Sequence, residues 1–306
     1  MMYDMIVIGG GPAGMTAALY ALRNGKTVLV LEKHGFGGQI THSPKVENYP
    51  GTLQMSGNEF ADRFLEQILA QGADVELEKA IAVKTEGNLR IVETEEGGRY
   101  EALTVVIATG VKHRMLGLEG ENELVGEGIS FCAVCDGDFY TDRTVCVAGG
   151  GNSALQEAIL LAEKCKEVII LQDLPALTGE VRLQQVLESR KNVRVLTNLK
   201  INKLLKNGEA LSGVEVENRT TGQKREIACD GLFVAIGLIP ENEPFKDLHT
   251  LNQYGYFDTD EQCETNTPGI YVAGDCRSKF VRQLTTAVAD GATAALAACR
   301  YINERK

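Results

Sequence analysis

Two cysteines, Cys132 and Cys135, are separated by two residues and followed directly by Asp136. A Cys-x-x-Cys pair closes a small ring, so that disulfide and dithiol interconvert with little movement, and the thiol pKa values of such pairs are often lowered. The competing interpretation is half of a zinc ribbon. No second pair lies within about 20 residues to complete one, so we expect a redox pair and no metal site.

A glycine-rich loop of the dinucleotide-binding kind lies near the start of the chain. A buried strand is expected over 5–8, a helix over 14–23, and a second strand over 27–31 that ends on Glu32. The candidate cofactor residues of the loop are Gly9, Gly11, Pro12, Ala13 and Gly14. Such glycines permit the turn and the close approach of a pyrophosphate, which rests on the helix N-terminus. The acidic residue is placed to accept hydrogen bonds from a ribose hydroxyl pair, so the unit predicts dinucleotide binding.

The segments that follow favour FAD over NAD. An expected strand over 104–107 runs into Ala108-Thr109-Gly110, and a later strand ends in Gly274-Asp275, where a carboxylate can hold flavin hydroxyl groups. An expected small-residue helix over 288–298 comes next, and its N-terminus can face the pyrimidine end of the flavin. The candidate FAD-binding residues of these segments are Gly38, Gln39, Asn48, Ala108, Thr109, Gly110, Gly274, Asp275, Arg282, Gln283, Thr286 and Ala287.

The composition is that of an ordinary globular protein. A chain of 306 residues with 44% hydrophobic and 24% charged residues can form two domains, and a formal net charge of −11 argues against general nucleic-acid binding. No apolar segment approaches the roughly 20 residues that span a bilayer, and no signal peptide precedes the first strand, so we expect a cytoplasmic protein. Four of the eight cysteines are expected to be core thiols: Cys146, Cys165, Cys229 and Cys299. The roles of Cys263 and Cys276, in loops, stay open.

Together these motifs closely resemble the low-molecular-weight thioredoxin reductases, over essentially the whole chain. The resemblance implies an α/β fold of two Rossmann-like, three-layer ββα dinucleotide-binding domains, the second inserted into the first. Residues 1–112 and 243–306 would bind FAD, and residues 113–242 would form a disulfide-redox domain. It also implies a homodimer that reduces thioredoxin. By position, Cys135 would exchange electrons with the flavin, Cys132 would attack the disulfide of thioredoxin, and Asp136 would protonate the leaving thiolate.

The sequence departs from this family at its second nucleotide loop. The glycine pattern is intact in Gly149, Gly151 and Ala154, but the strand over 168–171 runs into Gln172-Asp173-Leu174. The family has His-Arg-Arg there, and its guanidinium groups bind the 2′-phosphate of NADPH. An acidic and an apolar residue replace the two arginines, and Asp173 would repel a 2′-phosphate. NADPH is therefore not the expected donor, and the pyridine-nucleotide site is degenerate.

Several electron sources remain open. The ferredoxin-dependent flavin thioredoxin reductases, which have this architecture without a working NADPH site, resemble the chain most. Alternatively, Asp173 holds the ribose hydroxyls of NADH, or the protein is a flavin dithiol oxidase that passes electrons to oxygen, or a deazaflavin is the donor. A non-catalytic redox sensor is disfavoured by Asp136, because an acid beside the pair matters only for turnover.

A basic cluster bears on a protein donor. Six positive and no negative charges fall between residues 189 and 206, at Arg190, Lys191, Arg194, Lys200, Lys203 and Lys206. An acidic electron carrier can dock on such a patch. A solvated strand pair with lysines on its edge fits the same pattern.

Overall fold

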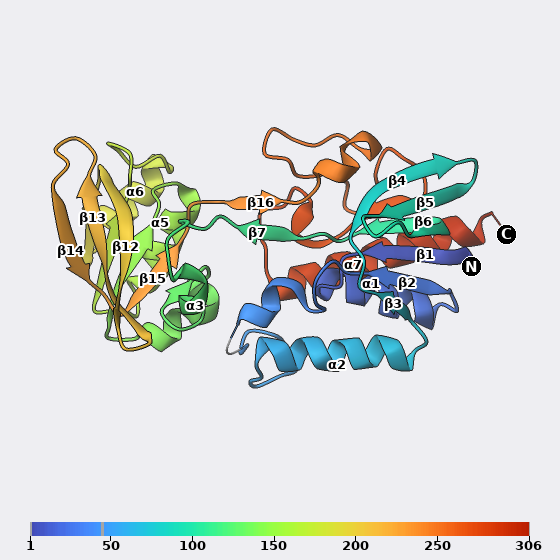
Figure 1. Ribbon diagram of the computed structural model, residues 1–306, viewed down its shortest axis with the longest axis horizontal. Coiled ribbons are helices and arrows are strands. Elements are labelled where there is room, and N and C mark those ends of the chain that lie inside the picture. Colours follow the sequence, from blue (N-terminus) through green and yellow to red (C-terminus); the bar gives the residue numbers. More distant parts are fainter. Residues whose placement is uncertain (1, 44–45, 306) are drawn as a thin grey trace. The chain divides into compact units, whose positions relative to one another are not determined.

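The computed structural model describes residues 2–43 and 46–305, and it divides into two compact units. The first unit is Met1–Lys112 with Ile239–Lys306, and the inserted unit is His113–Leu238 (Figure 1). Two short strands, β7 (Val111–His113) and β16 (Leu238–Pro240), carry the chain between them and pair as a two-stranded sheet.

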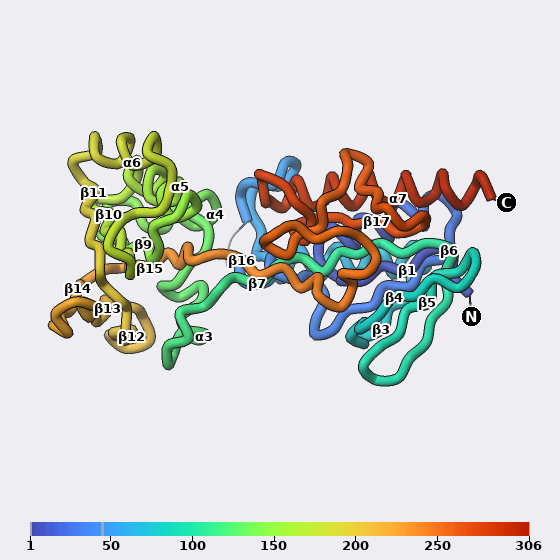
Figure 2. Tube along the Cα trace, turned by 90° about the horizontal axis from the view of Figure 1, so that it is seen from above, coloured from blue at the N-terminus to red at the C-terminus, as the bar shows by residue number. Residues whose placement is uncertain are grey.

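The first unit contains an open sheet with helices on one face (Figure 2). Its strands are β1 (Met2–Ile8), β2 (Val28–Leu31), β3 (Asp74–Glu76), β4 (Ala80–Glu86), β5 (Leu89–Thr94), β6 (Arg99–Ile107) and β17 (Ile270–Val272). Its helices are α1 (Pro12–Arg23), α2 (Gly57–Ala70) and α7 (Leu284–Asn303), with short 3₁₀ turns η1 (Gly38–His42), η3 (Glu243–Leu248) and η4 (Gly274–Cys276).

The order of the strands brings the ends of β1, β6 and β17 together. β1 pairs in parallel with β2 and β6, and β17 pairs in parallel with β6. The other end of β6 pairs antiparallel with β5, which pairs antiparallel with β4. Strands buried on both faces have continuous apolar runs, as residues 5–8 do. α1 packs against α7 so closely that a Cβ at Gly291 would collide with Ala13 O, which explains the small residues of α7.

The inserted unit has three layers. Its parallel sheet has the order β11-β10-β9-β15-β8, a second, antiparallel sheet has the order β12-β13-β14, and the helices cover the other face of the parallel sheet. The strands are β8 (Ile129–Ser130), β9 (Thr144–Ala148), β10 (Glu167–Leu171), β11 (Val193–Leu196), β12 (Leu199–Asn207), β13 (Ala210–Asn218), β14 (Lys224–Ala228) and β15 (Gly231–Val234). The helical segments are α3 (Glu121–Leu124), α4 (Ala133–Asp136), η2 (Gly137–Tyr140), α5 (Asn152–Leu161) and α6 (Val181–Glu188).

The fold class predicted from the sequence, two Rossmann-like α/β domains with the second inserted into the first, is confirmed. Each unit contains a strand–glycine loop–helix–strand motif, β1-α1-β2 in the first and β9-α5-β10 in the second. Across the described residues, none of the helices has the length and apolar character needed to cross a membrane.

Candidate active site

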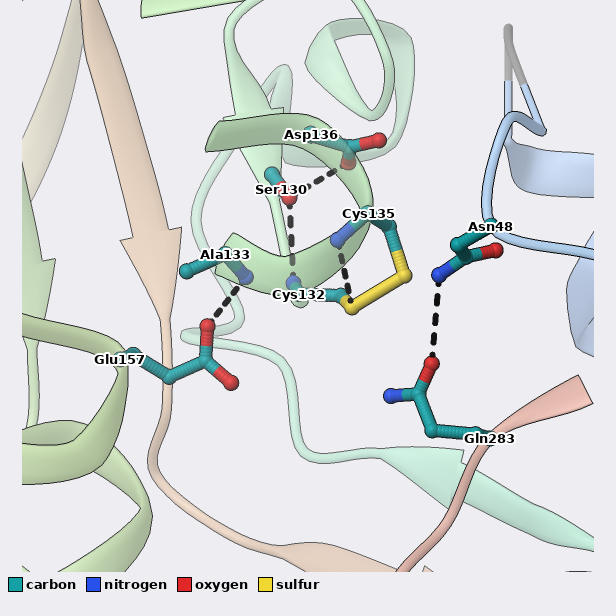
Figure 3. The surroundings of a disulfide bond; sticks show 8 residues. All are labelled: Asn48, Ser130, Cys132, Ala133, Cys135, Asp136, Glu157 and Gln283. Carbon is teal, nitrogen blue, oxygen red and sulfur yellow. Dashed lines mark hydrogen bonds between the residues drawn. A yellow bond between two sulfur atoms is a disulfide. The ribbon is translucent and has the colours of Figure 1, made fainter. Parts of the chain in front are cut away.

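The cysteine pair forms a disulfide in the inserted unit. Cys132 and Cys135 are joined with their Cα atoms 5.3 Å apart, and Cys132 is the N-cap of the one-turn helix α4 (Figure 3). The Cys135 N–H donates a hydrogen bond of 3.2 Å to Cys132 Sγ. Val134, between them, is 52% exposed, so the turn that carries the pair reaches the surface of its unit. This geometry suits a reversible disulfide that meets another protein.

Asp136 directly follows the pair at the end of α4, in a setting that favours its protonated form. Ser130 Oγ donates to Asp136 Oδ2 at 2.6 Å and accepts from the Cys132 N–H at 3.1 Å. Asp136 Oδ1 is buried without a hydrogen-bond partner among the described residues. Burial raises the pKa of Asp136 above its usual range, although the Ser130 hydrogen bond opposes the rise. The protonated form of Asp136 is therefore more favoured than in a free aspartate.

Two polar residues of this site were missed in the sequence. Ser130 connects Asp136 to the backbone of Cys132, and Glu157 accepts a hydrogen bond from the Ala133 N–H. Ser130 stands two residues before the pair in the sequence, but no sequence pattern indicates that its hydroxyl bonds to Asp136. Glu157 is 24 residues from Ala133, and only the packing of α5 beside α4 brings them together.

The first glycine loop is shaped for a close ligand. Gly9 has a φ of +110°, and a Cβ there would collide with Ala108 O, while one at Gly14 would collide with Gly9 O. At Gly11, the N-cap of α1, a Cβ would meet only Gly37 O at 3.8 Å, so the backbone is open to approach. Glu32 Oε2 accepts the Gly10 N–H at 2.7 Å, which orients the carboxylate over the loop. These features match the pyrophosphate and ribose sites of a dinucleotide fold.

Asp275 is an independent sign that this edge of the unit binds a polar group. Its Oδ1 is buried with no hydrogen-bond partner among the described residues, and burial raises the pKa of its carboxyl although Lys279 and Arg282 oppose the rise. Buried carboxylate oxygens are normally hydrogen-bonded, so this one needs a donor from outside the chain. The hydroxyl groups of FAD are such donors, and the residues present therefore fit this cofactor.

A buried ion cluster holds the Gly274-Asp275 turn in place. Asp290 of α7 accepts the Gly274 N–H at 3.1 Å and pairs with Arg277 at 3.0 Å and Lys279 at 2.8 Å. All three side chains of these ion pairs are largely buried. The cluster ties α7 to the end of β17, where the unpartnered carboxylate lies.

The remaining predicted cofactor residues gather at the same edge of the first unit. Ala108, Thr109 and Gly110 follow β6, beside the loop after β1 and the turn after β17, because parallel strands end at one edge. The helix α7 begins earlier than predicted, at Leu284, so that Thr286 and Ala287 lie in its first turn. Three hydrogen bonds involve the other predicted residues: Thr109 Oγ1 to Asn242 Oδ1 (3.1 Å), Asn48 Nδ2 to Gln283 Oε1 (3.4 Å, Figure 3) and Gln283 N to Thr286 Oγ1 (3.1 Å). The Arg282 guanidinium lies over the Tyr256 ring, 4.3 Å from its centroid. Gly38 and Gln39 begin η1, and Pro12 and Ala13 begin α1.

Replacing Asp275 with asparagine is expected to have opposite effects with and without FAD. Loss of a charge-assisted hydrogen bond is expected to weaken FAD binding by roughly 10–100-fold. In the FAD-free protein the raised pKa makes the carboxyl destabilising as pH rises through that pKa, so at neutral pH the variant is expected to be more stable, by roughly 1–3 kcal/mol.

Fluorescence titration with FAD and thermal unfolding of both forms measure these effects. Asp258→Asn, an exposed carboxylate of the same unit, is the control and is expected to change neither quantity. Equal loss of stability with and without FAD would assign Asp275 a structural role instead.

The second glycine loop repeats the backbone of the first. Gly149 has a φ of +122°, and its N–H donates to Leu171 O at 2.9 Å, as that of Gly9 donates to Leu31 O at 2.8 Å. In this correspondence Gln172, not Asp173, occupies the place of Glu32, since each directly follows the second strand. The Gln172 side chain is buried against Gly150 and donates to Ala176 O at 3.2 Å.

Asp173 faces a cation of its own chain. It pairs with Arg219 at 2.8 Å, and both side chains are about half exposed. The repulsion of a 2′-phosphate predicted for Asp173 is therefore partly compensated by Arg219. The same ion pair occupies the Asp173 carboxylate, which the NADH alternative requires for the ribose hydroxyls.

All six cysteines outside the pair are buried thiols, and part of the basic cluster is paired with acidic residues. Cys263 Sγ donates to Asp290 O at 3.7 Å and Cys276 Sγ to Ala273 O at 3.3 Å, both buried, and burial raises the pKa of both thiols. Within the basic cluster the ion pairs are Arg190–Glu163, Arg194–Glu167 and Lys206–Glu123. Half of the cluster is thus neutralised by residues from other segments. Residues 2–43 and 46–305 contain no His/Cys/Asp/Glu group arranged for a metal ion.

Comparison with known proteins gives matches along the whole chain. A family model described as pyridine nucleotide-disulphide oxidoreductase matches residues 3–291. The chain is 41% identical to a 34.2 kDa protein in a rubredoxin operon of Clostridium pasteurianum, covering 98% of this chain and 97% of that protein. It is 37% identical to a thioredoxin reductase of Listeria monocytogenes, covering 99% and 95%. Among solved structures, thioredoxin reductase from Streptococcus pyogenes is 38% identical with a TM-score of 0.94, and that of Lactococcus lactis (FR conformation) is 34% identical with a TM-score of 0.69, each covering 99% of both chains.

Proposed function

Because the chain belongs to the pyridine nucleotide-disulphide oxidoreductase family, and within it to the thioredoxin reductases, we propose that its electrons come from reduced ferredoxin rather than NADPH. The chain is a flavin-dependent disulfide reductase with FAD as cofactor. The observation that carries the proposal is the end of β10, where Gln172, Asp173 and Leu174 stand in place of the His-Arg-Arg that binds the 2′-phosphate in the family. We also propose that it acts on thioredoxin as a homodimer.

The first unit is proposed to hold FAD. The loop after β1 and the N-terminus of α1 would bind the pyrophosphate, Glu32 the adenosine ribose, and Asp275 a hydroxyl of the flavin half. FAD bound there would supply the chemistry that links one-electron donation by an iron–sulfur carrier to the two-electron reduction of a disulfide. Gln283 and the first turn of α7 are proposed to face its pyrimidine end.

The cysteine pair is proposed to pass these electrons to thioredoxin. Reduction breaks the Cys132–Cys135 bond and leaves Cys132 as a thiolate, which the Cys135 N–H stabilises by the hydrogen bond that it already makes to Cys132 Sγ. The thiolate attacks the thioredoxin disulfide and forms a mixed disulfide, and one thioredoxin sulfur leaves as a thiolate. Asp136, whose pKa burial raises, supplies the proton for that sulfur. Cys135 then attacks Cys132, which releases the second thioredoxin sulfur and restores the disulfide.

Three contacts around the second glycine loop support a donor other than a pyridine nucleotide, and hence other than NADPH. Its position for the ribose is taken by the buried Gln172, whose amide is already hydrogen-bonded, and Asp173 is paired with Arg219. Glu180 bonds to Asn152 at 2.9 Å and so brings a carboxylate to the first residue of α5, where a pyrophosphate would rest. A like charge at that position opposes a phosphate ligand.

NADH is the second candidate donor, because the loop backbone is intact. Gly149 keeps its positive φ, and at Gly151 a Cβ would meet only Thr178 Oγ1 at 3.8 Å, so the approach to α5 is open there. NADH lacks the 2′-phosphate and therefore needs no arginines at the end of the second strand.

Anaerobic reduction of the flavin tests the proposal. Reduced ferredoxin is expected to bleach the flavin absorbance and to sustain thioredoxin reduction, whereas NADPH is expected to do neither. The control is the same ferredoxin in its oxidised form. Rapid bleaching by NADH at submillimolar concentration would replace ferredoxin with NADH as donor. Failure of all three donors, together with oxygen consumption on a small dithiol, would make the protein a dithiol oxidase.

A further inference from the structure

Glu157 brings a carboxylate to the first residue of the redox helix. Its side chain comes from the second turn of α5, and Oε2 accepts a hydrogen bond from the N–H of Ala133, the residue after Cys132 (Figure 3). Both residues belong to the inserted unit. The electron path proposed above does not use this carboxylate.

The setting of Glu157 makes its charge change near neutral pH. Burial is the main cause that raises the pKa of Glu157 to about 7, and the Ala133 hydrogen bond opposes the rise; when Asp136 is ionised, its charge adds to the rise. The group therefore changes charge near neutral pH, and its hydrogen-bond partner Ala133 directly follows Cys132, whose sulfur becomes charged on reduction.

The other titratable groups around α5 are engaged elsewhere or neutral. Glu167 of β10 pairs with Arg194 at 3.1 Å, Asp138 of η2 pairs with Lys164, Glu180 bonds to Asn152, and Arg182 and Glu188 of α6 are exposed. Burial raises the pKa of Tyr140 of η2 to about 12, and a hydrogen bond to Cys229 with burial raises that of Cys146 of β9. Asp136 and the cysteine pair are thus the groups whose charge Glu157 meets directly.

We propose that Glu157 is a positioning residue that anchors α4 and takes up one proton when the Cys132–Cys135 disulfide is reduced. In this step the S–S bond breaks and two electrons enter the pair. One proton makes Cys135 a thiol, Cys132 becomes a thiolate, and the second proton converts the Glu157 carboxylate to the acid. With a dithiol as reductant, that dithiol is oxidised to its own disulfide and releases both protons.

The coupling follows from repulsion between two negative charges. A thiolate at Cys132 and a carboxylate bonded to the next N–H disfavour each other in a partly buried site. Reduction therefore favours protonated Glu157 and, by linkage, ionised Glu157 makes reduction less favourable. At low pH the Glu157 carboxyl is already protonated, so it does not disfavour reduction of the disulfide. Above its pKa the extra proton must be taken from solution, so reduction weakens as pH rises.

Glu157→Gln tests proton uptake separately from the anchoring hydrogen bond. The glutamine amide oxygen still accepts the Ala133 N–H but does not titrate. The measurement is the equilibrium of the FAD-loaded protein with reduced and oxidised dithiothreitol, read by alkylation of the pair and mass spectrometry. At about pH 6 variant and wild type are expected to agree within about twofold, and at about pH 8 the reduction constant of the variant is expected to be about tenfold larger, one pKa unit of coupling. Glu163→Gln, an exposed carboxylate just after α5, is the matched control and is expected to follow wild type.

A ratio of variant to wild type that is the same at both pH values would leave Glu157 as an anchor alone and overturn the proton coupling. If Glu157→Gln does not retain FAD, the pH dependence of cysteine alkylation in the wild-type protein provides the test instead. The alkylation rate of its reduced Cys132 must then depend on two ionisations, and a single ionisation overturns the inference. The inference rests on the proposed role of the pair and not on the donor. A pair that no dithiol reduces at any pH would contradict that proposed role itself.

Discussion

Replacing Cys132 with serine is expected to lower thioredoxin reduction by on the order of 10³-fold or more, and replacing Cys135 is expected to have an effect as large. A serine hydroxyl is not ionised at neutral pH and cannot form a disulfide, so either change breaks the path. The two variants are nevertheless expected to differ, because the two sulfurs have different proposed tasks.

The difference lies in what each remaining sulfur can reach. In Cys132→Ser the remaining thiol, Cys135, is expected still to perturb the flavin absorbance spectrum, while no mixed disulfide with thioredoxin forms. In Cys135→Ser the flavin–thiol exchange is expected to disappear, and Cys132 is expected to be trapped in a stable mixed disulfide with thioredoxin, because no thiol remains to resolve it.

Absorbance spectra of both variants and non-reducing gels with thioredoxin measure these outcomes. Cys165→Ala, a buried thiol outside the pair, is the control and is expected to retain turnover within about threefold. Identical spectra and identical trapping in the two variants would contradict the assignment of tasks to Cys132 and Cys135.

Local patterns in the sequence were sufficient for the fold class, the cofactor and the enzyme class. Strands of a parallel sheet buried on both faces have apolar runs, so residues 5–8 and 168–171 could be identified without neighbours. Each glycine loop directly follows such a strand, and the positive φ values of Gly9 and Gly149 explain why glycine stands there. The Cys-x-x-Cys pair is likewise a local feature, and both of its cysteines are joined in the structure.

The parts that escaped prediction depend on contacts between distant segments. Arg219 lies 46 residues from Asp173, and no spacing rule connects the turn after β13 with the end of β10. The basic cluster over 189–206 had no acidic residue within it, yet Glu123, Glu163 and Glu167 reach it from other elements. Asp290 meets Gly274 only because α7 packs beside η4. In each case the partner is supplied by packing, which a pattern along the chain does not contain.

A graft of two arginines is expected to give this chain the NADPH affinity that it lacks. The change is Asp173→Arg with Leu174→Arg, which places two guanidinium groups where the family has them at the end of the second strand. Each charge-assisted contact to the 2′-phosphate contributes roughly 1.5–3 kcal/mol, so two contacts are expected to tighten NADPH binding by roughly 10²–10⁴-fold. Removal of Asp173 also frees Arg219, which the ion pair now occupies.

NADH provides the internal comparison, because it differs from NADPH only in lacking the 2′-phosphate. The graft is expected to leave NADH affinity nearly unchanged, so the ratio of the two dissociation constants, measured by calorimetry, isolates the phosphate contacts. Glu188→Arg with Gln185→Arg on the exposed face of α6 adds the same total charge elsewhere in the unit and controls for general attraction of anions. If this control tightened NADPH as much as the graft, the identity of residues 172–174 would not explain donor choice. If the unmodified chain already bound NADPH at submillimolar concentration and its flavin were reduced at once, the end of β10 would not exclude NADPH and the case for ferredoxin would lose its main support.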